Sequence, residues 1–382
     1  MQQMIYRLDD ASSRGILTEV HIADIHFGVI DPQTHYMILN EQFLNKIARI
    51  NFDVLSIDGD LFDHKFMSNS DVVLYAIKFI DNCVELCKAK GATLVILHGT
   101  RSHDSDQLKL FYHYIDDRDI DIRIVENIKF EYIKNAKVLC IPEEYGKGAG
   151  YYYPYLYHSG QYDTAFMHGT FKGSIFGANK VDLETERPVF DINCFGNCLG
   201  PIIAGHVHTG GCFDRHFYYT SCPIRYRYGE EEPKGFMVIL HNLDTHEYYP
   251  HFEEIQSFRY DTINLDHMLN KDPKEVVTYL KQLQASGVDN IRVEFTSNDN
   301  MANIELLKNF FRNDSSIKIN AENAIVVETL SKNQEAIDKY SDMGFLLDPS
   351  LSSDEKFVQY VNYKEGYEFI TVDKLVEILK SC

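Results

Sequence analysis

Five short apolar runs, each ending in Asp or His, constrain this chain more than any other feature of its sequence. Each run has the length and apolar content of a buried strand, and Gly or polar residues follow it at once. Ligands gather at the carboxyl ends of strands in open α/β sheets, so we expect the five tips to meet at one place. The segments are 19–26 (EVHIADIH), 54–63 (VLSIDGDLFD), 94–104 (LVILHGTRSHD), 165–169 (AFMHG) and 201–208 (PIIAGHVH).

Helical patterns alternate with the first three of these runs. Residues 36–50 and 72–86 carry apolar side chains close to helical spacing, and strand–helix alternation is typical of a layered sheet with helices on its faces. From about residue 120 to 255 strands dominate, which indicates two sheets packed face to face. The sequence therefore predicts an α/β fold built on a two-sheet β-sandwich flanked by helices.

The composition changes near residue 258, and a smaller α/β unit is predicted to follow. It reads as strand, helix (273–285), strand, helix (303–311) and strand. The last segment has two short amphipathic helical patterns with too little core to stand alone, so we expect it to bind a partner. The predicted organisation is a main domain at 1–257, an α/β cap at 258–330, a linker at 331–353 and a helical tail at 354–382.

Charge and composition limit the partners and the compartment. The formal net charge is −20, whereas a protein that binds nucleic acid alone usually has a basic surface. Any nucleic acid is therefore expected to be held by a local patch, by bound metal or by a partner. No apolar run approaches 18 residues, which predicts no membrane span, and eight scattered cysteines are typical of the reducing cytoplasm. We expect a cytoplasmic protein, in the host cytoplasm if the source is viral.

The polar tips supply Asp and His in a number and order that suit two metal ions. Asp24 and His26 are expected on one face of an extended tip, because side chains alternate along a strand. Each motif is a weak signal alone, and His168 gains its weight only from the others. Two further motifs supply the pairs Asp60 with Asp63 and His206 with His208 as candidate site residues.

In this order the motifs DxH, GDxxD, GxxSHD, HG and GHxH resemble those of the calcineurin-like metallophosphoesterases. More narrowly they resemble the nuclease subunit of the SbcCD type, a DNA-repair exonuclease partnered by an SMC-like ATPase. The stretch 220–236, with TSCPIR, GEE and KGF, is similar to a strand pair of that subfamily. The resemblance covers about 17–245, and for the cap and tail it is architectural only.

The resemblance implies a site with two divalent ions, of which Mn²⁺ suits mixed Asp and His ligands best. The nucleophile would be a metal-bound hydroxide. His103 would steady the charge on the phosphate or protonate the leaving oxygen, and Asp63 would orient His103. The implied ligands are Asp24, His26 and His208 for one ion and His168 and His206 for the other, with Asp60 bridging them.

One segment departs from the family. Where the family writes GNHD, with Asn as a ligand, this chain reads GTRSHD from Gly99 to Asp104. Ser102 occupies the Asn register, and His98 or water are the alternatives. Arg101 either contacts phosphate or lies in solvent, and Arg225 is a second candidate contact to the DNA backbone.

The expected function is a metal-dependent DNA exonuclease and endonuclease that acts in end processing, repair or recombination. It would work as a homodimer with an SbcC-type ATPase subunit, whose coiled coil the tail would bind. Two alternatives stay open. One is a phosphodiesterase or phosphatase for small molecules, and the other is a catalytically weak scaffold that keeps the fold.

Overall fold

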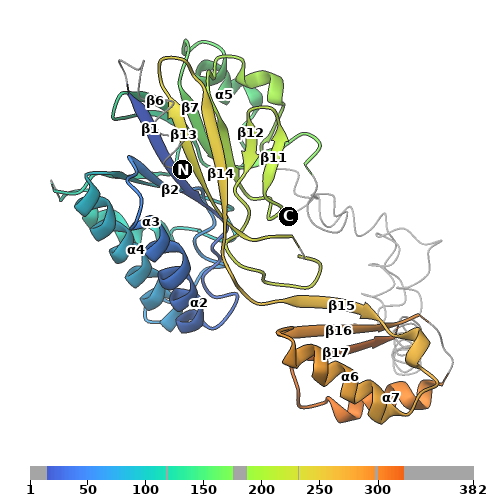
Figure 1. Ribbon diagram of the computed structural model, residues 1–382. Coiled ribbons are helices and arrows are strands. Elements are labelled where there is room, and N and C mark those ends of the chain that lie inside the picture. The colour runs from blue at the N-terminus through green and yellow to red at the C-terminus, as the bar shows by residue number, and fades with distance from the viewer. Residues whose placement is uncertain (1–14, 118, 175–186, 231, 297–299, 322–382) are drawn as a thin grey trace, which may run out of the picture. The chain divides into compact units, whose positions relative to one another are not determined.

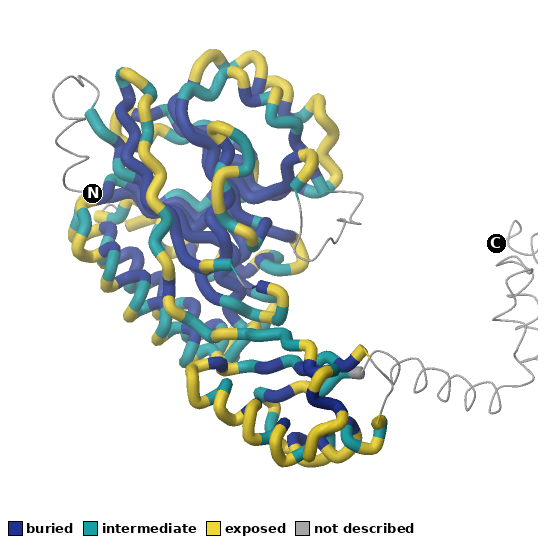
Figure 2. Tube along the Cα trace, turned by 45° about the vertical axis from the view of Figure 1, so that its right-hand side comes forward, coloured by how far each residue is buried: buried dark blue, intermediate teal, exposed yellow. Residues whose placement is uncertain are grey.

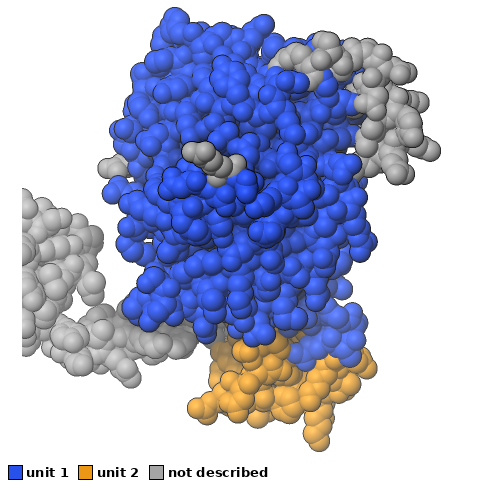
Figure 3. All heavy atoms as spheres, turned by 90° about the vertical axis from the view of Figure 1, so that its left-hand side faces the viewer, with its two compact units in different colours: residues 1–261, 283–290 blue, residues 262–282, 291–382 orange. Residues whose placement is uncertain are grey.

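The computed structural model describes residues 15–117, 119–174, 187–230, 232–296 and 300–321 (Figure 1). The chain divides into two compact units, residues 1–261 with 283–290 and residues 262–282 with 291–382 (Figure 3). The predicted linker 331–353 and tail 354–382 lie outside the described residues. No helix in the described part of the chain is long and apolar enough to cross a membrane.

The first unit contains two six-stranded sheets of mixed direction. The order of the first sheet is β14-β13-β1-β2-β3-β4. Strands β1 to β4 run parallel, β13 pairs antiparallel with β1, and β14 pairs antiparallel with β13. Its strands are β1 (Ile16–Ile22), β2 (Val54–Ile57), β3 (Thr93–Leu97), β4 (Ile122–Val125), β13 (Gly235–Asn242) and β14 (Tyr248–Glu254).

The second sheet has the order β11-β12-β10-β7-β6-β5, with four parallel strands between two antiparallel edge strands. Its strands are β5 (Lys129–Ile133), β6 (Ala136–Ile141), β7 (Thr164–His168), β10 (Ile202–Gly205), β11 (Gly211–Asp214) and β12 (Phe217–Tyr219). A short parallel pair, β8 (Thr170–Phe171) and β9 (Val189–Phe190), follows β7.

Three hydrophobic clusters fill the first unit, and one of them takes side chains from both sheets. That cluster includes Val54 and Val95 of the first sheet with Val138 and Phe166 of the second. A second cluster joins the other side of β1 to β3 to the helices α2 (Pro32–Leu39) and α4 (Asp71–Lys90). A third joins β6, β7 and β10 to α5 (Ala149–Leu156). The dark central strands in Figure 2 are this buried interior. The mixed α/β architecture is as the sequence predicts.

Helix α4 (Asp71–Lys90) shows how local signals set an element. Ser70 caps it by accepting a hydrogen bond from Val73 N, and Gly91 ends it in the left-handed conformation. Its buried residues recur every three or four positions, from Val73 to Cys87, and they face the first sheet. The predicted helix at 72–86 is therefore confirmed.

The predicted helix at 36–50 is more complex than a single α-helix. It begins earlier, at Pro32, after Asp31 has capped Thr34 N. A π-helical turn at Asn40–Leu44 then separates α2 (Pro32–Leu39) from α3 (Asn45–Ile47). The spacing of hydrophobic residues alone does not predict such a turn. The remaining short helices of this unit are α5 (Ala149–Leu156) and the 3₁₀ segments η2 (Gln107–Tyr114) and η3 (Ile192–Phe195).

The second unit is a small α/β structure on the sheet β15-β16-β17. Strands β16 and β17 are parallel, and helix α6 coincides with the predicted helix at 273–285. The elements of this part are β15 (Tyr260–Asn264), η4 (Asp266–Met268), α6 (Pro273–Ala285), β16 (Asn290–Phe295), α7 (Met301–Phe310) and β17 (Ile317–Ala321).

Candidate metal centre

The carboxyl ends of parallel strands from both sheets meet at one place, and three glycines make this convergence possible. A Cβ on Gly59 would lie 2.2 Å from His168 Nδ1, and one on Gly99 would lie 2.2 Å from Asp60 N. A Cβ on Gly205 would lie 2.2 Å from the carbonyl oxygen of Asp58. Because real Cβ atoms do not approach this closely, glycine is required at the ends of β2, β3 and β10.

Four of the predicted ligands have backbone conformations that L-residues rarely adopt. The φ angles are 52° at Asp24, 51° at His26, 54° at Asp60 and 93° at His206. Positive φ outside glycine costs free energy, and such residues cluster at functional sites. The expectation that Asp24 and His26 alternate on an extended tip is wrong, because β1 ends at Ile22. Hydrogen bonds from Asp24 N to Gly59 O and from His26 N to Asp60 O hold the two segments together instead.

The first metal-compatible cluster is formed by Asp24, His26 and His208, whose ligand atoms lie within 4.8 Å of one another. His26 Nε2 is 3.2 Å from His208 Nε2, so the two imidazoles face a common point. The Asp24 carboxylate accepts the backbone N–H of His206, at 2.9 Å from Oδ2. Tyr226 closes this side, because its hydroxyl donates to the carbonyl oxygens of Asp24 and Ile25.

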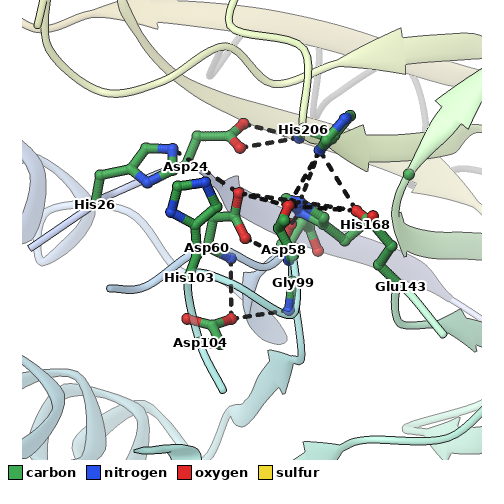
Figure 4. Close-up of polar contacts among 12 residues, drawn as sticks. Asp24, His26, Asp58, Asp60, Gly99, His103, Asp104, Glu143, His168 and His206 are labelled. Carbon is green, nitrogen blue, oxygen red and sulfur yellow. Dashed lines mark hydrogen bonds and ion pairs between the residues drawn. The ribbon is translucent and has the colours of Figure 1, made fainter. Parts of the chain in front are cut away.

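The second cluster contains Asp60, His168 and His206, again with ligand atoms within 4.8 Å (Figure 4). Asp60 Oδ2 is 3.3 Å from His168 Nε2, and His206 Nδ1 is 3.3 Å from the same nitrogen. The Asp58 carbonyl oxygen contacts His168 Nδ1 at 2.7 Å, which leaves Nε2 for a ligand. Because Asp60 Oδ2 is also 3.9 Å from His26 Nε2, Asp60 lies between the two clusters.

His103 lies beside the first cluster, with its ring 4.6 Å from that of His26 in an edge-on contact. Its Nδ1 is hydrogen-bonded to the backbone carbonyl of Asp63. Asp63 is the predicted orienting residue, and it holds His103 through its backbone carbonyl rather than through its carboxylate. The Asp63 carboxylate lies 3.9 Å from His26 Nδ1 and 2.9 Å from His64 Nδ1.

The loop after β3 places Thr100 at the cluster, whereas Ser102 is exposed. Thr100 Oγ1 is 3.1 Å from Asp60 Oδ2 and 3.4 Å from His206 Nδ1. His98, the alternative for the Asn position, is turned toward the carbonyl oxygens of Gly99 and Ser105. The two extra residues of this loop therefore displace Ser102 outward, and the residue next to Gly99 takes the inner position.

Asp104 holds the same loop in place. Its buried carboxylate accepts hydrogen bonds from the backbone N–H groups of Gly99, Asp60 and Phe62. Three such bonds join the end of β3 to the end of β2, so Asp104 positions Asp60 without facing the cluster itself.

The two predicted phosphate contacts are placed differently. Arg101 is exposed and lines a groove of about 540 Å³ that Lys65, Lys147 and Glu143 also line. Arg225 is half-buried, and its guanidinium donates to the backbone carbonyl of Glu232. Arg225 therefore supports the segment behind the site, while Arg101 borders an open groove.

That segment, residues 220–236, forms the support of His208. Glu230 Oε1 lies 3.1 Å from His208 Nδ1, and buried Lys234 donates to the His208 carbonyl oxygen at 2.8 Å. Ser221 Oγ donates to the same carbonyl. Buried Cys222 lies with His208 and Glu230 in a further group of potential ligands. These contacts fix His208 with Nε2 toward His26.

Burial and charge act against each other on the pKa values of the site. Burial lowers the pKa of His26 and of His206 well below the ordinary value, so both imidazoles are neutral and keep a lone pair for a ligand. Burial also opposes protonation of His168, but the carboxylate of Asp60 outweighs it and raises that pKa to about 10. Burial tends to raise the pKa of Asp60, yet His168 and His26 hold it well below its ordinary value. A bound cation would replace the proton between His168 and Asp60.

Sequence reasoning missed Glu143, Thr100 and Glu230. Glu143 directly follows the apolar strand 136–141 and Pro142, which is the same strand-plus-polar-tip signal as the five predicted tips. Glu230 lies in the GEE motif of the stretch 220–236 but was given no role, and Thr100 gave no comparable signal, because both roles depend on tertiary contacts.

No protein-family model matches the sequence, and no curated protein matches it. Among solved structures, one titled as a cold-active protein tyrosine phosphatase and one titled as its mutant align with 63% of this chain and 81% of theirs. They are 13% and 14% identical to it, each at a TM-score of 0.28. A further crystal structure aligns over all of its own length with 12% identity and a TM-score of 0.39. Similarity at this level identifies no family.

Proposed function

We propose that this chain is a metal-dependent DNA exonuclease and endonuclease with the calcineurin-like metallophosphoesterase fold, of the SbcD type. The observation that carries the proposal is the pair of adjacent Asp and His clusters with Asp60 between them. The Asp and His residues occur along the chain in the order of the family motifs. The hydrophobic cluster shared by the two sheets is compatible with the β-sandwich of that family.

The donor set fits two divalent ions. The clusters offer imidazole nitrogens and carboxylate oxygens, a mixture that suits Mn²⁺, Fe²⁺ or Zn²⁺ better than Mg²⁺. His26 and His206 are neutral and buried, and Asp60 stays ionised, as ligands must. Burial opposes protonation of His168 and His208, but nearby acidic groups outweigh it and raise both pKa values, so bound ions would have to displace the protons of these two imidazoles. Two bound ions would activate water and neutralise charge on a phosphodiester. Asp24, His26 and His208 would hold one ion, Asp60, His168 and His206 the other.

His103 is the proposed acid or charge-stabilising group. The Asp63 carbonyl occupies its Nδ1, so Nε2 is the nitrogen available to a phosphate oxygen. The edge-on contact with His26 keeps the ring beside the first cluster. His103 can therefore donate a proton to a leaving oxygen without losing its orientation.

The DNA and protein partners are proposed from the sequence resemblance. The net charge of −20 is compatible with a subunit that leaves much of its DNA affinity to an SMC-like ATPase, and we propose that this subunit works as a homodimer with it. Arg101 is the proposed contact to the phosphate backbone. Lys65 and Lys147 lie along the same groove, but carboxylates that include Glu126 and Glu144 also line it, so bound metal or a partner would have to offset their charge.

Cleavage of linear duplex DNA by the purified full chain with Mn²⁺, and not with EDTA, tests the proposal. The measurement is made alone and with any SMC-like ATPase that co-purifies. Asp60→Asn should abolish cleavage, while Asp119→Asn, at an exposed carboxylate, should not change it. Hydrolysis of bis-p-nitrophenyl phosphate without DNA cleavage would instead establish the small-molecule alternative. Mn²⁺ binding without hydrolysis of either substrate would establish a scaffold.

A further inference from the structure

The second cluster has one more carboxylate than its sequence motifs supply. Glu143 follows β6, and its backbone N–H donates to the His98 carbonyl oxygen, which joins the ends of β6 and β3. Its side chain enters the cluster, and the residue is only 3% exposed (Figure 4). A carboxylate buried this deeply next to Asp60 is costly unless a positive charge compensates it.

One oxygen of Glu143 faces the nitrogens that surround the second ion position. Glu143 Oε2 lies 3.4 Å from His206 Nδ1 and 3.7 Å from His168 Nε2. Thr100 Oγ1 is 3.4 Å from the same oxygen. Donors about 2.1 Å from a common ion are about 3 to 3.5 Å apart. The two spacings of 3.4 Å fall within this range and the 3.7 Å spacing to His168 is slightly wider, so a small movement of Glu143 would complete the ligand set.

The other oxygen of Glu143 has a separate partner. Glu143 Oε1 lies 2.6 Å from Arg187 Nε, a charged contact that orients the carboxylate. Arg187 NH1 also lies 2.6 Å from His206 Nε2. A cation held at Nδ1 of neutral His206 would require the ring proton at Nε2, so Arg187 would then turn from that nitrogen while it keeps Glu143.

We infer that Glu143 is a fourth protein ligand of the second metal ion, with Arg187 as its positioning residue. The inference rests on the proposed two-ion function and deepens it. Thr100 contributes only a hydroxyl beside His206, and Glu143 supplies an anionic oxygen from another strand. Arg187 offsets part of the added negative charge and keeps the Glu143 carboxylate aimed at the ion.

Mn²⁺ titration of the EDTA-stripped full chain by calorimetry tests the inference, with electron paramagnetic resonance to detect a coupled ion pair. The wild type should bind two ions. Glu143→Ala should keep one and bind the second at least about tenfold more weakly, with loss of the coupled signal. Glu143→Gln keeps the shape of the side chain and one amide oxygen, so it should lose less affinity for the second ion. This variant provides the test if Glu143→Ala does not fold.

The matched control is Glu144→Gln, one residue further along the same strand end. The Glu144 carboxylate accepts from Ile128 N and Tyr151 Oη, so this variant should bind both ions as the wild type does. Arg187→Met should weaken the second ion less than Glu143→Ala. Two ions bound with unchanged affinity by both Glu143 variants would overturn the inference and leave the proposed function intact. A wild type that binds one ion would overturn both.

Discussion

Single residues at the strand ends determine whether the two clusters can form. At Gly59 the backbone has a φ of +87°, and a Cβ would lie 2.2 Å from His168 Nδ1. Gly91 at the end of α4 also has positive φ, at +62°, but no atom lies within 4 Å of its Cβ position. Alanine substitutions at Gly59 and at Gly91 therefore separate the energetic cost of the backbone conformation from the cost of a steric clash.

Gly59→Ala should lower the free energy of unfolding by about 3 kcal/mol or more, because strain and overpacking add. Gly91→Ala should cost only about 1 kcal/mol, since it has the strain alone. Urea unfolding in EDTA measures both values without any contribution from metal. Equal losses in the two variants would show that the approach of Gly59 to His168 is not tight.

A second residue-scale prediction concerns Glu230, which supports His208 from behind. Glu230→Gln should weaken binding of one Mn²⁺ ion about 10- to 100-fold, because the hydrogen bond that orients a ligand histidine also strengthens it as a donor. Glu253→Gln is the control, since the Glu253 carboxylate pairs with Lys46 and with His251 of β14 instead. Calorimetric titration distinguishes the variants, and wild-type affinity in Glu230→Gln would contradict the role.

Most of the residues that the structure brings together were predicted because they follow an apolar run, and Glu143 after β6 is the exception. Asp60 and His168 are examples, because a strand end fixes both their position and their neighbours. Ser102 is the residue that an alignment of this loop with the GNHD motif predicts, although the loop is two residues longer. Such an alignment does not determine how the loop folds. Thr100 reaches Asp60 only because Asp104 ties that loop to β2.

At the scale of elements, β1, β2 and β13 enclose a polar network within the first unit. His21 Nδ1 is 2.8 Å from Asp58 Oδ2, and His21 Nε2 is 3.1 Å from Glu19 Oε2. All three side chains are fully buried, and the ring of Phe166 from β7 packs edge-on against His21. Burial opposes protonation of His21, but Asp58 and Glu19 outweigh it and raise its pKa to about 9.

This network predicts that metal-free protein loses stability as pH rises. A histidine whose folded pKa exceeds its unfolded value stabilises fully below about pH 6.5, and the contribution disappears as pH rises through 9. The shift corresponds to a decrease of about 3 kcal/mol. His168, with its pKa near 10, contributes with the same sign. Unfolding by urea in EDTA at pH 6.5 and 9.5 measures the change.

His21→Gln should reduce this pH dependence, since the group that titrates is gone, and should lower stability most at pH 6.5. His251→Gln is the control, because His251 is largely exposed on β14 and should leave the pH dependence unchanged. A free energy of unfolding that stays constant between these pH values would contradict protonation of His21 in the folded state.

Elements defined by strong local signals were predicted closely, and those shaped by tertiary contacts were not. Helix α6 has Pro273 at its start and a clear apolar face, so its bounds agree with the prediction. The π turn at Asn40–Leu44 changes the register of the helical face, which apolar spacing cannot reveal. The pairing of β13 with β1 joins residues more than 200 positions apart, and no local pattern specifies it.

At the scale of the whole molecule, every described residue of both clusters belongs to the unit formed by residues 1–261 and 283–290. Within that unit the ligands come from the ends of β1, β2, β7 and β10, which belong to two different sheets. A ligand that binds only the folded state stabilises it according to its concentration and affinity. Metal ions held here would therefore link the two sheets to each other.

Mn²⁺ should raise the free energy of unfolding of this unit by about 2.7 kcal/mol for each ion present at 100 times its dissociation constant. Hydrogen exchange resolved by peptides should show the added protection in segments 22–27, 58–63, 165–169 and 204–208, because these strand ends carry the ligands. Asp60→Asn should remove most of the effect, since Asp60 lies between the two clusters, while Asp119→Asn should keep it. Added protection in only one sheet would mean that the bound ions do not link the two sheets. The position of Asp60 between the two clusters would then have no role in metal binding.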